Sequence, residues 1–285
     1  CPTQRRLAAS LALCAASAST LAQTPDDERG FSYFMGLGAQ STTYRETPST
    51  FPAKSHARVT NPLLITGAVY AIDTDLLLSL DGESTFAPGT TTERWTATVP
   101  VINGVTLADS LLQTNSFTLQ ETTTRLLLHY RVRDQLFAVG GPSFHSQSFK
   151  RYAFTVLAPS TVIAPPTDTV VEESASEVMV HGGLALESER VRNSRNHYNL
   201  RATVGVPMWR RVENTQYPGR TFSKIGGYEL GLAGRYSYAV TPRLHVGLWG
   251  QMLYSQRQRQ VNGNLELPES TLSSVGAGLE LLWKL

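Results

Sequence analysis

The sequence contains very little cysteine. Cys1 and Cys14 are its two cysteines, and both lie within the first 14 residues. We predict below that this segment is a signal peptide, so the chain that follows it has no means of forming a disulfide. A secreted protein without disulfides must be stabilised by packing and by pairing of its backbone.

An excess of one charge and long apolar runs are also lacking. The chain has 25 basic and 23 acidic residues, with a net charge of +2, and so lacks the basic excess of a nucleic-acid-binding protein. No apolar run reaches the length of about 18 residues that a membrane-spanning helix needs. If the protein lies in a membrane, it must therefore be a closed barrel, the other fold that satisfies every backbone polar group in lipid.

Sequence motifs of catalysis and cofactor binding are missing as well. The chain has no phosphate-binding loop, no G-x-S-x-G and no dinucleotide fingerprint. His129, His181 and His245 could face one another, and three histidines can bind zinc. Their expected heights along a barrel differ, however. We therefore predict no catalytic residues, no cofactor and no metal site.

The N-terminus has the pattern of a secretory signal peptide. Arg5 and Arg6 precede an apolar and alanine-rich stretch, residues 7–18, and Thr20-Leu21-Ala22 is a small-x-small cleavage site. We predict a signal peptide over residues 1–22 and a short periplasmic leader over residues 23–29. The remainder, residues 30–285, is predicted to be one barrel domain.

The last stretch, residues 271–285, alternates between two kinds of side chain, with Leu282 as the one exception. One face is apolar and carries Trp283, and the other is small or charged and carries Glu280. This stretch resembles the C-terminal strand of bacterial outer-membrane β-barrels, although Leu285 stands where that family usually has Phe or Trp. The resemblance implies a Gram-negative outer membrane, contact with its lipid and lipopolysaccharide, and recognition by the barrel-assembly machinery.

Nine further stretches alternate in a similar way, which predicts an all-β, antiparallel, up-and-down transmembrane barrel of about ten strands. Eight or twelve strands remain open as alternatives. The stretches are residues 31–40, 62–72, 76–83, 125–132, 135–149, 177–187, 198–208, 227–238 and 244–255.

The connections are predicted to alternate between short and long, as in barrels with short periplasmic turns and longer outer loops. Residues 41–61 are predicted to be a loop. Residues 86–117 form the longest connection, where Asn103-Gly104 predicts a hairpin above the membrane or an upward continuation of the strands. Pro142 predicts a bulge or kink in its strand.

Outward-facing aromatic residues are predicted to form two belts, as expected at the two membrane–water interfaces. The periplasmic belt would contain Phe31, Tyr33, Tyr70, Tyr130, Tyr198, Tyr236, Tyr238 and Trp283. The outer belt would contain Tyr44, Tyr152, Trp209, Phe222 and Tyr254.

The inward face is predicted to be rich in charge. Its members are Asp81, Glu83, Arg125, His129, Arg131, Glu177, His181, Glu187, Arg201, Glu229, Arg235, His245 and Glu280. A barrel of eight strands is just filled by its side chains, and one of sixteen holds a water channel. We therefore favour an ion network that plugs the lumen, with a narrow polar pore as the alternative.

Two families of outer-membrane enzymes invite comparison with this sequence. Asp81 and Glu83 share a face and are similar to an acidic pair of the omptins, the ten-stranded outer-membrane proteases, but this sequence has no Asp-x-His. Outer-membrane lipid A deacylases use a His and a Ser two residues apart. Here Ser146 and Ser148 are one and three residues from His145, so both face away from it in a regular strand.

These observations together predict a non-enzymatic outer-membrane barrel. Its role would be structural, surface-binding or adhesion-like, through outer loops rich in Thr, Pro and Val, because function concentrates in loops on a rigid scaffold. The extracellular ligand is not specified by the sequence. A narrow channel for small solutes and an outer-membrane hydrolase are the alternatives.

Overall fold

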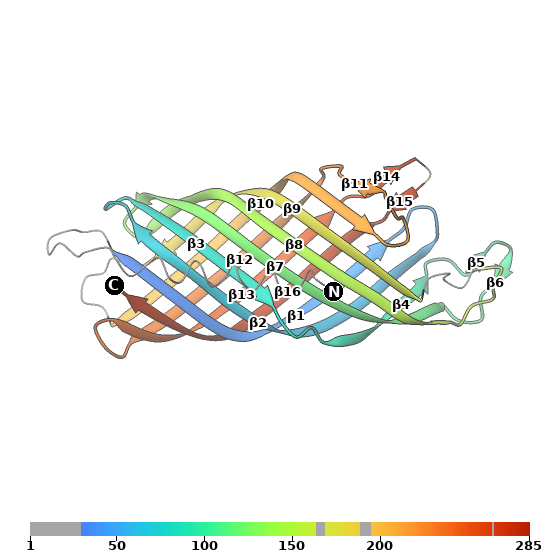
Figure 1. The fold of residues 1–285 in the computed structure, drawn as a ribbon, viewed down its shortest axis with the longest axis horizontal. Coiled ribbons are helices and arrows are strands. Elements are labelled where there is room, and N and C mark those ends of the chain that lie inside the picture. The colour runs from blue at the N-terminus through green and yellow to red at the C-terminus, as the bar shows by residue number, and fades with distance from the viewer. Residues whose placement is uncertain (1–29, 164–168, 189–194, 264) are drawn as a thin grey trace.

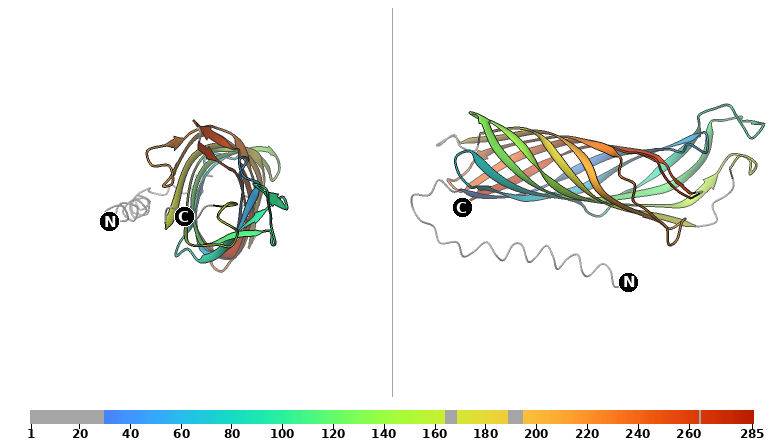
Figure 2. Two further views of the ribbon diagram at one scale, coloured as in Figure 1. Left: turned by 90° about the vertical axis from the view of Figure 1, so that its right-hand side faces the viewer. Right: turned by 90° about the horizontal axis from the view of Figure 1, so that it is seen from above.

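The computed structural model describes residues 30–163, 169–188, 195–263 and 265–285. The predicted signal peptide and leader, residues 1–29, lie outside these residues. The described chain is built from antiparallel strands that run obliquely around a single axis (Figure 1). Viewed from one end, the strands form a ring (Figure 2).

Ten strand positions make up the ring in the described part of the chain, because β3 and β4 lie end to end between β2 and β7. The ring elements are β1 (Phe31–Thr47), β2 (Ala53–Ala71), β3 (Leu76–Thr85), β4 (Thr90–Ala97), β7 (Leu111–Arg133), β8 (Leu136–Val156), β9 (Val170–Glu187), β10 (Asn196–Asn214), β12 (Gly227–Ala239), β13 (Leu244–Arg257) and β16 (Glu269–Lys284). Short strands decorate one end: β5 (Val101–Ile102), β6 (Val105–Thr106), β11 (Thr221–Phe222), β14 (Gln260–Asn262) and β15 (Leu265–Leu267).

The ring is closed by its first and last strands. β1 pairs with β2 on one side and with β16 on the other, from Ser32 opposite Lys284 to Thr47 opposite Glu269. Closure leaves no free sheet edge in lipid, which is the condition for a sheet to span a membrane. The predicted all-β barrel of ten strands, and its closure by the C-terminal strand, are confirmed.

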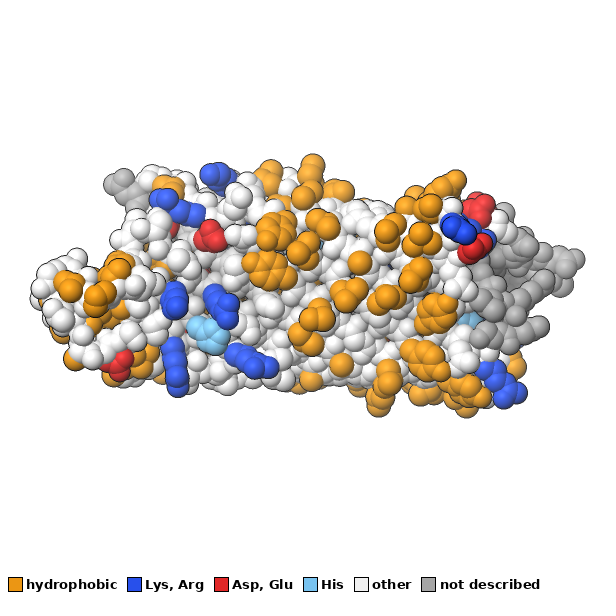
Figure 3. Space-filling model, turned by 180° about the vertical axis from the view of Figure 1, so that it is seen from behind, with side chains coloured by type: hydrophobic (Ala, Val, Ile, Leu, Met, Phe, Trp, Pro, Cys, Tyr) orange, Lys and Arg blue, Asp and Glu red, His pale blue; other side chains and the backbone are white. Residues whose placement is uncertain are grey.

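On the face that Figure 3 shows, hydrophobic side chains form a band over the half of the barrel that lies toward the short turns. Its exposed members include Met35, Leu37, Leu80, Leu126, Leu128, Leu184, Leu200, Val204, Leu230, Leu248, Leu279 and Leu281. Tyr33, Tyr70, Tyr130, Tyr198, Tyr236 and Tyr238 are exposed near the short turns, as predicted for the periplasmic belt. Trp283 joins them by stacking on Tyr33 at a centroid distance of 6.0 Å.

No helix in the described residues is both long and apolar enough to cross a membrane.

The barrel is much taller than this band. β7 has 23 residues, which at about 3.3 Å per residue and a tilt of about 35–45° gives a height of about 55 Å. The apolar band of such barrels is about 25 Å tall. The far half of the barrel therefore stands outside the membrane.

The prediction of a loop over residues 41–61 is wrong. β1 continues to Thr47 and β2 starts at Ala53, so the connection is five residues long. The error has a physical cause: outside the membrane the polarity of the wall is inverted. Lys54, His56 and Arg58 face solvent, whereas Ala57 and Val59 face the lumen and are buried.

The same inversion corrects the predicted outer aromatic belt. Trp209 is 46% exposed and Tyr254 is partly exposed, but Tyr44 and Phe222 are buried at 1% and 2% exposure. Tyr44 has the same parity on β1 as the inward Gln40 and Thr42, so the alternation itself places it inside.

The region 86–117 contains the hairpin that was predicted, and the ring strands also continue upward through β4 and β7. Asn103 and Gly104 have φ angles of 50° and 77°, the left-handed pair required by a two-residue hairpin turn, here between β5 and β6. The predicted bulge at Pro142 is absent from the pairing of β8, because its register is the same on both sides of Gly141-Pro142. The ladder to β7 is interrupted there instead.

Candidate functional site

The lumen of the barrel is filled by side chains, arranged as apolar layers that alternate with polar ones. The layer nearest the short turns is formed by Leu77, Leu127, Phe137, Val139 and Ala185. The second contains Phe34, Leu63, Ile65 and Trp249. The third, in the outer half, contains Tyr44, Ala57, Val59, Phe117, Leu119, Phe149 and Leu272.

Trp249 occupies the lumen because glycines on β1 and β16 make room for its ring. A β-carbon added at Gly36 or Gly38 would lie 2.8 Å or 2.7 Å from atoms of the indole, and one at Gly276 would lie 3.3 Å away. Trp249 is only 4% exposed. The glycines at alternate positions of these two strands therefore leave space for one large side chain.

A network of ion pairs crosses the lumen within the membrane band. Asp81 lies 2.6 Å from Arg201 and 3.7 Å from Arg235. The guanidinium of Arg125 lies 2.5 Å from the carboxylate of Glu83 and 3.6 Å from that of Glu229. Glu280, as predicted, points to the lumen and lies 3.3 Å from Arg235. Arg125 and Glu83 lie on the neighbouring strands β7 and β3, whereas each of the other pairs joins strands that are not neighbours in the ring. The network therefore connects separate parts of the wall, and the predicted inward charged face is confirmed.

The three histidines considered for zinc have separate partners. His129 bonds Ser79 at 2.9 Å and lies 2.5 Å from Glu187. His181 bonds Ser143 at 2.7 Å, and the ring of His245 packs edge-on against His197 at 4.6 Å. No three His, Cys, Asp or Glu side chains within the described ranges are placed to hold a metal ion.

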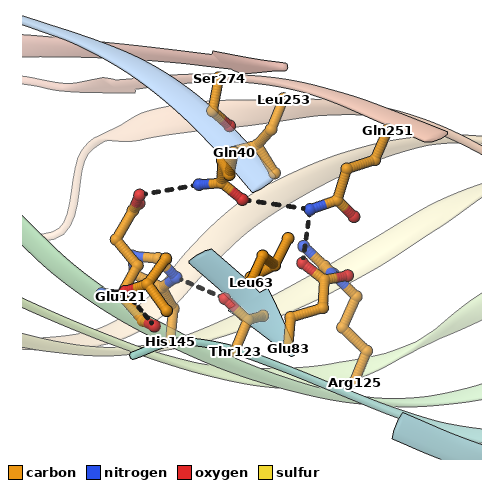
Figure 4. Close-up of a pocket in the computed structure, with 11 residues that line it drawn as sticks. Gln40, Leu63, Glu83, Glu121, Thr123, Arg125, His145, Gln251, Leu253 and Ser274 are labelled. Atoms are coloured by element: carbon orange, nitrogen blue, oxygen red, sulfur yellow. Dashed lines mark hydrogen bonds and ion pairs between the residues drawn. The ribbon is translucent and has the colours of Figure 1, made fainter. Parts of the chain in front are cut away.

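A polar cluster lies above the ion network (Figure 4). Gln40 donates to Glu121 at 3.0 Å, and Gln251 donates both to Gln40 at 3.3 Å and to Glu83 at 3.2 Å. His145 and Thr123 are hydrogen-bonded at 2.8 Å. The cluster surrounds a cavity of about 20 Å³, and a polar cavity of that size accommodates about one water molecule.

Two similar cavities adjoin this one. Glu83, Arg125 and Gln251 line both the first cavity and the second one, and His145 lines both the first cavity and the third. The second and third cavities each have a volume of about 20 Å³. Leu253 lines all three cavities. The lumen thus contains at least three adjoining spaces of about the size of a water molecule.

Arg151 closes the outer part of the lumen. Its guanidinium bonds Glu93 at 2.7 and 2.9 Å and Glu46 at 2.8 Å. The guanidinium also lies over the aromatic rings of the third apolar layer, 4.5 Å from the centroid of Phe149 and 5.9 Å from that of Phe117. A cation inside an aromatic box with two charged acceptors is held both by cation–π attraction and by charge-assisted hydrogen bonds.

The connections at the outer rim have small apolar cores of their own. Ala53, Ile102, Leu112 and Val162 pack beneath the β5–β6 hairpin. A second small core joins β11 and β15 to the wall and contains Ala175, Val212, Phe222 and Leu267. These cores present ordered turns to solvent.

Glu266 fastens one of these rim connections to another. Its carboxylate accepts hydrogen bonds from the backbone amide of Ser49 at 2.8 Å and from the Ser49 hydroxyl at 3.0 Å. Partial burial raises the pKa of Glu266, but these hydrogen bonds outweigh it and hold the pKa below its usual value. The charged form is therefore the one that joins the two connections.

The residues compared with hydrolases lie in different surroundings from those expected at an outer rim. Asp81 and Glu83 were expected near the outer rim, but they lie deep in the lumen, buried against arginines. Ser146 and Ser148 face outward while His145 faces inward, as the spacing predicts.

Sequence reasoning missed two buried parts of the lumen, Trp249 and the Arg151 box. Glycines 36, 38, 276 and 278 at alternate inward positions were a signal for the first. The second had no local signal, because Arg151 is 58 residues from Glu93 and 105 residues from Glu46.

No protein-family model matches the chain, and no curated protein matches it in sequence. Among solved structures, a deletion mutant of the monoaromatic hydrocarbon channel TodX matches with 11% identity, 92% coverage of this chain, 91% of that chain and a TM-score of 0.37. OprG from Pseudomonas aeruginosa matches with 9% identity, 90% and 97% coverage and a TM-score of 0.34. The translocator domain of the autotransporter NalP from Neisseria meningitidis matches with 8% identity, 96% and 95% coverage and a TM-score of 0.34.

Similarities this low do not transfer the function of any of these proteins. The architecture is defined by the chain's own features. The described strands form a closed antiparallel ring, with an apolar band outside, a charged lumen inside and an aromatic belt at the short turns. These are the features of a bacterial outer-membrane β-barrel.

Proposed function

We propose that the protein is a closed, non-enzymatic barrel that acts through its outer surface, in binding or in the integrity of the envelope. The observation that supports this most is the filled lumen. Three apolar layers, an ion network and the Arg151 box succeed one another along the axis. A solute would have to displace all of them.

The outer end supports a role in surface contact. About half of the barrel height stands outside the membrane, which a barrel that serves only as a membrane anchor does not need. Val99, Val101 and Leu157 are 40%, 48% and 54% exposed near the outermost hairpin. Apolar side chains exposed on an ordered rim are typical of a contact surface.

A narrow channel is the second candidate, and the row of water-sized cavities favours it. The three cavities share Leu253, so small movements of that side chain would join them. The cavities have polar linings, with Glu121, Arg125 and His145 among the residues. Such a path would carry small ions and would exclude larger solutes.

Planar-bilayer recording of the refolded protein separates the two candidates. We expect no conductance steps for the wild type. Steps that persist in the wild type and grow in Leu253→Ala would establish the channel and overturn the closed barrel. Continued absence of steps in both Leu253→Ala and Arg151→Ser would support the closed barrel, because the remaining apolar layers and the ion network would still fill the lumen.

A further inference from the structure

Five basic side chains gather on the outer face of the wall, beyond the apolar band. Arg45 of β1, His56 of β2 and Arg94 of β4 stand opposite one another in register, so they form a row across three neighbouring strands about 4.8 Å apart. Lys54 and Arg58 flank His56 two residues away on the same face. We call these five residues the basic patch, and Figure 3 shows it as blue side chains around one histidine, away from the hydrophobic band.

The cations of the basic patch are not neutralised by the protein. Within the described residues, Arg45, Lys54, Arg58 and Arg94 form no ion pair, whereas other exposed bases on the outer wall do, such as Lys150 with Glu172 at 3.2 Å. The carboxylates of the adjoining positions point inward: Glu46 is 3% exposed and Glu93 is fully buried. These two serve Arg151.

The positive charges of the basic patch affect the pKa of His56, which lies among them. Burial and the charges of Arg45, Arg58 and Arg94 lower the pKa of His56. Like charges held this close repel one another unless an anion lies between them. The patch is therefore suited to a ligand with several negative charges.

The height of the basic patch matches the headgroup layer of the outer leaflet. On the lipid-facing side of β2, Leu64 is followed by the uncharged Pro62 and Thr60 and then by Arg58. Six residues of tilted strand separate Leu64 from Arg58, a height of about 15 Å. The patch is continuous with the lipid-facing surface of the same strands, so an anion bound there is one that belongs to the membrane.

We propose that the basic patch binds the phosphate groups of lipopolysaccharide, the phosphorylated glycolipid of the outer leaflet. Arginine recognises phosphate by paired hydrogen bonds, and a patch with three arginines and a lysine can engage two phosphates at once. The acyl chains of the same molecule would lie along the apolar band below. This inference does not depend on whether the lumen conducts.

The test compares two variants that lose the same charge. The patch variant carries Arg45→Gln, Lys54→Gln, Arg58→Gln and Arg94→Gln. The control variant carries four exposed bases changed elsewhere on the outer part of the barrel: Lys150→Gln, Arg211→Gln, Arg220→Gln and Arg259→Gln. Both are refolded in detergent and accepted when the unboiled protein migrates differently from the boiled protein on a gel. Arg58→Gln alone serves as a second test that preserves the fold.

Bisphosphorylated lipid A is titrated into the micelles, and bound lipid is counted by native mass spectrometry. Each basic residue near an anionic lipid surface contributes about fivefold to binding, so we expect Arg58→Gln to weaken binding about fivefold and the patch variant by more than about a hundredfold. The control variant should bind as the wild type does.

Three results would overturn the proposal. The first is equal binding by the patch variant and the control variant. The second is undiminished binding of lipid A from which both phosphates have been removed. The third is binding of inositol hexakisphosphate as tight as that of lipid A, which would make the patch a site for soluble polyanions.

Discussion

Removal of the Arg151 guanidinium should strongly destabilise the outer half of the barrel. Arg151 is 7% exposed, and Glu46 and Glu93 are 3% and 0% exposed. Arg151→Met keeps the volume of the side chain but leaves two buried carboxylates without their cation. Breaking a buried ion pair in this way costs about 3–5 kcal/mol, because an uncompensated charge remains in a medium of low polarity.

The magnitude is measured by reversible urea unfolding in detergent, followed by tryptophan fluorescence. The triple variant Glu46→Gln, Glu93→Gln and Arg151→Met removes all three charges and should recover most of the loss, to within about 1.5 kcal/mol of the wild type. The deficit of Arg151→Met should also shrink as the pH falls, because burial raises the pKa of Glu46 and its carboxylate is then neutralised by a proton. Arg211→Met is the control, since Arg211 is an exposed base paired with the exposed Glu213, and its cost should be below about 1 kcal/mol. A cost for Arg151→Met no greater than that of the control would refute the role of the box.

Three further predictions concern other parts of the barrel. Gly38→Ala should lower the free energy of unfolding by about 1–3 kcal/mol in the same assay, because the new β-carbon would lie 2.1 Å from a carbonyl oxygen of the neighbouring strand. Unchanged stability would contradict the close packing at this glycine. Trp283→Asp should reduce the folded fraction on gels, because it loses the stack on Tyr33, whereas Leu285→Phe should leave assembly unchanged or improved; normal insertion of Trp283→Asp would count against the periplasmic belt. The His56 imidazole should titrate below 6.5 by NMR, so the protein loses stability as the pH falls below the ordinary histidine pKa, and added lipid A should raise that midpoint; a midpoint at or above 6.5 without lipid would contradict the crowding of charge.

The membrane half of the barrel could be predicted from sequence because, in lipid, the apolar positions of an alternating strand must be the outward ones. Lipid requires apolar side chains outside, so alternation such as that of Leu279, Glu280 and Leu281 identifies both the strand and its inner face. The same requirement places tyrosines near the short turns. The number of strands and the closing pair followed from these signals.

The outer half could not be predicted in the same way, because no lipid fixes the polarity of its wall. There the outward positions are Lys54, His56 and Arg58, and the inward positions are small, so the stretch has the composition of a loop. Alternation persists, but only a search for inverted polarity would have found it.

The contacts across the lumen were beyond prediction for a different reason. Which side chains meet inside a barrel depends on the tilt and stagger of the strands, and these are properties of the closed ring. Asp81 therefore meets Arg201 of a strand on another part of the wall, and no local pattern indicates it. The sequence predicted a charged inward face and an ion network, but not which side chains form its pairs.

Access of water to the lumen tests the central claim most directly. The described residues contain no cysteine, so single cysteines can be introduced at Thr123, beside the mid-lumen cavity, and at Asn103, in the exposed hairpin turn. In refolded protein in vesicles, a charged, membrane-impermeant methanethiosulfonate reagent should label Asn103→Cys rapidly and leave Thr123→Cys unreacted until the protein is denatured. Labelling of Thr123→Cys at a rate comparable to that of Asn103→Cys would show an open lumen and contradict the closed barrel.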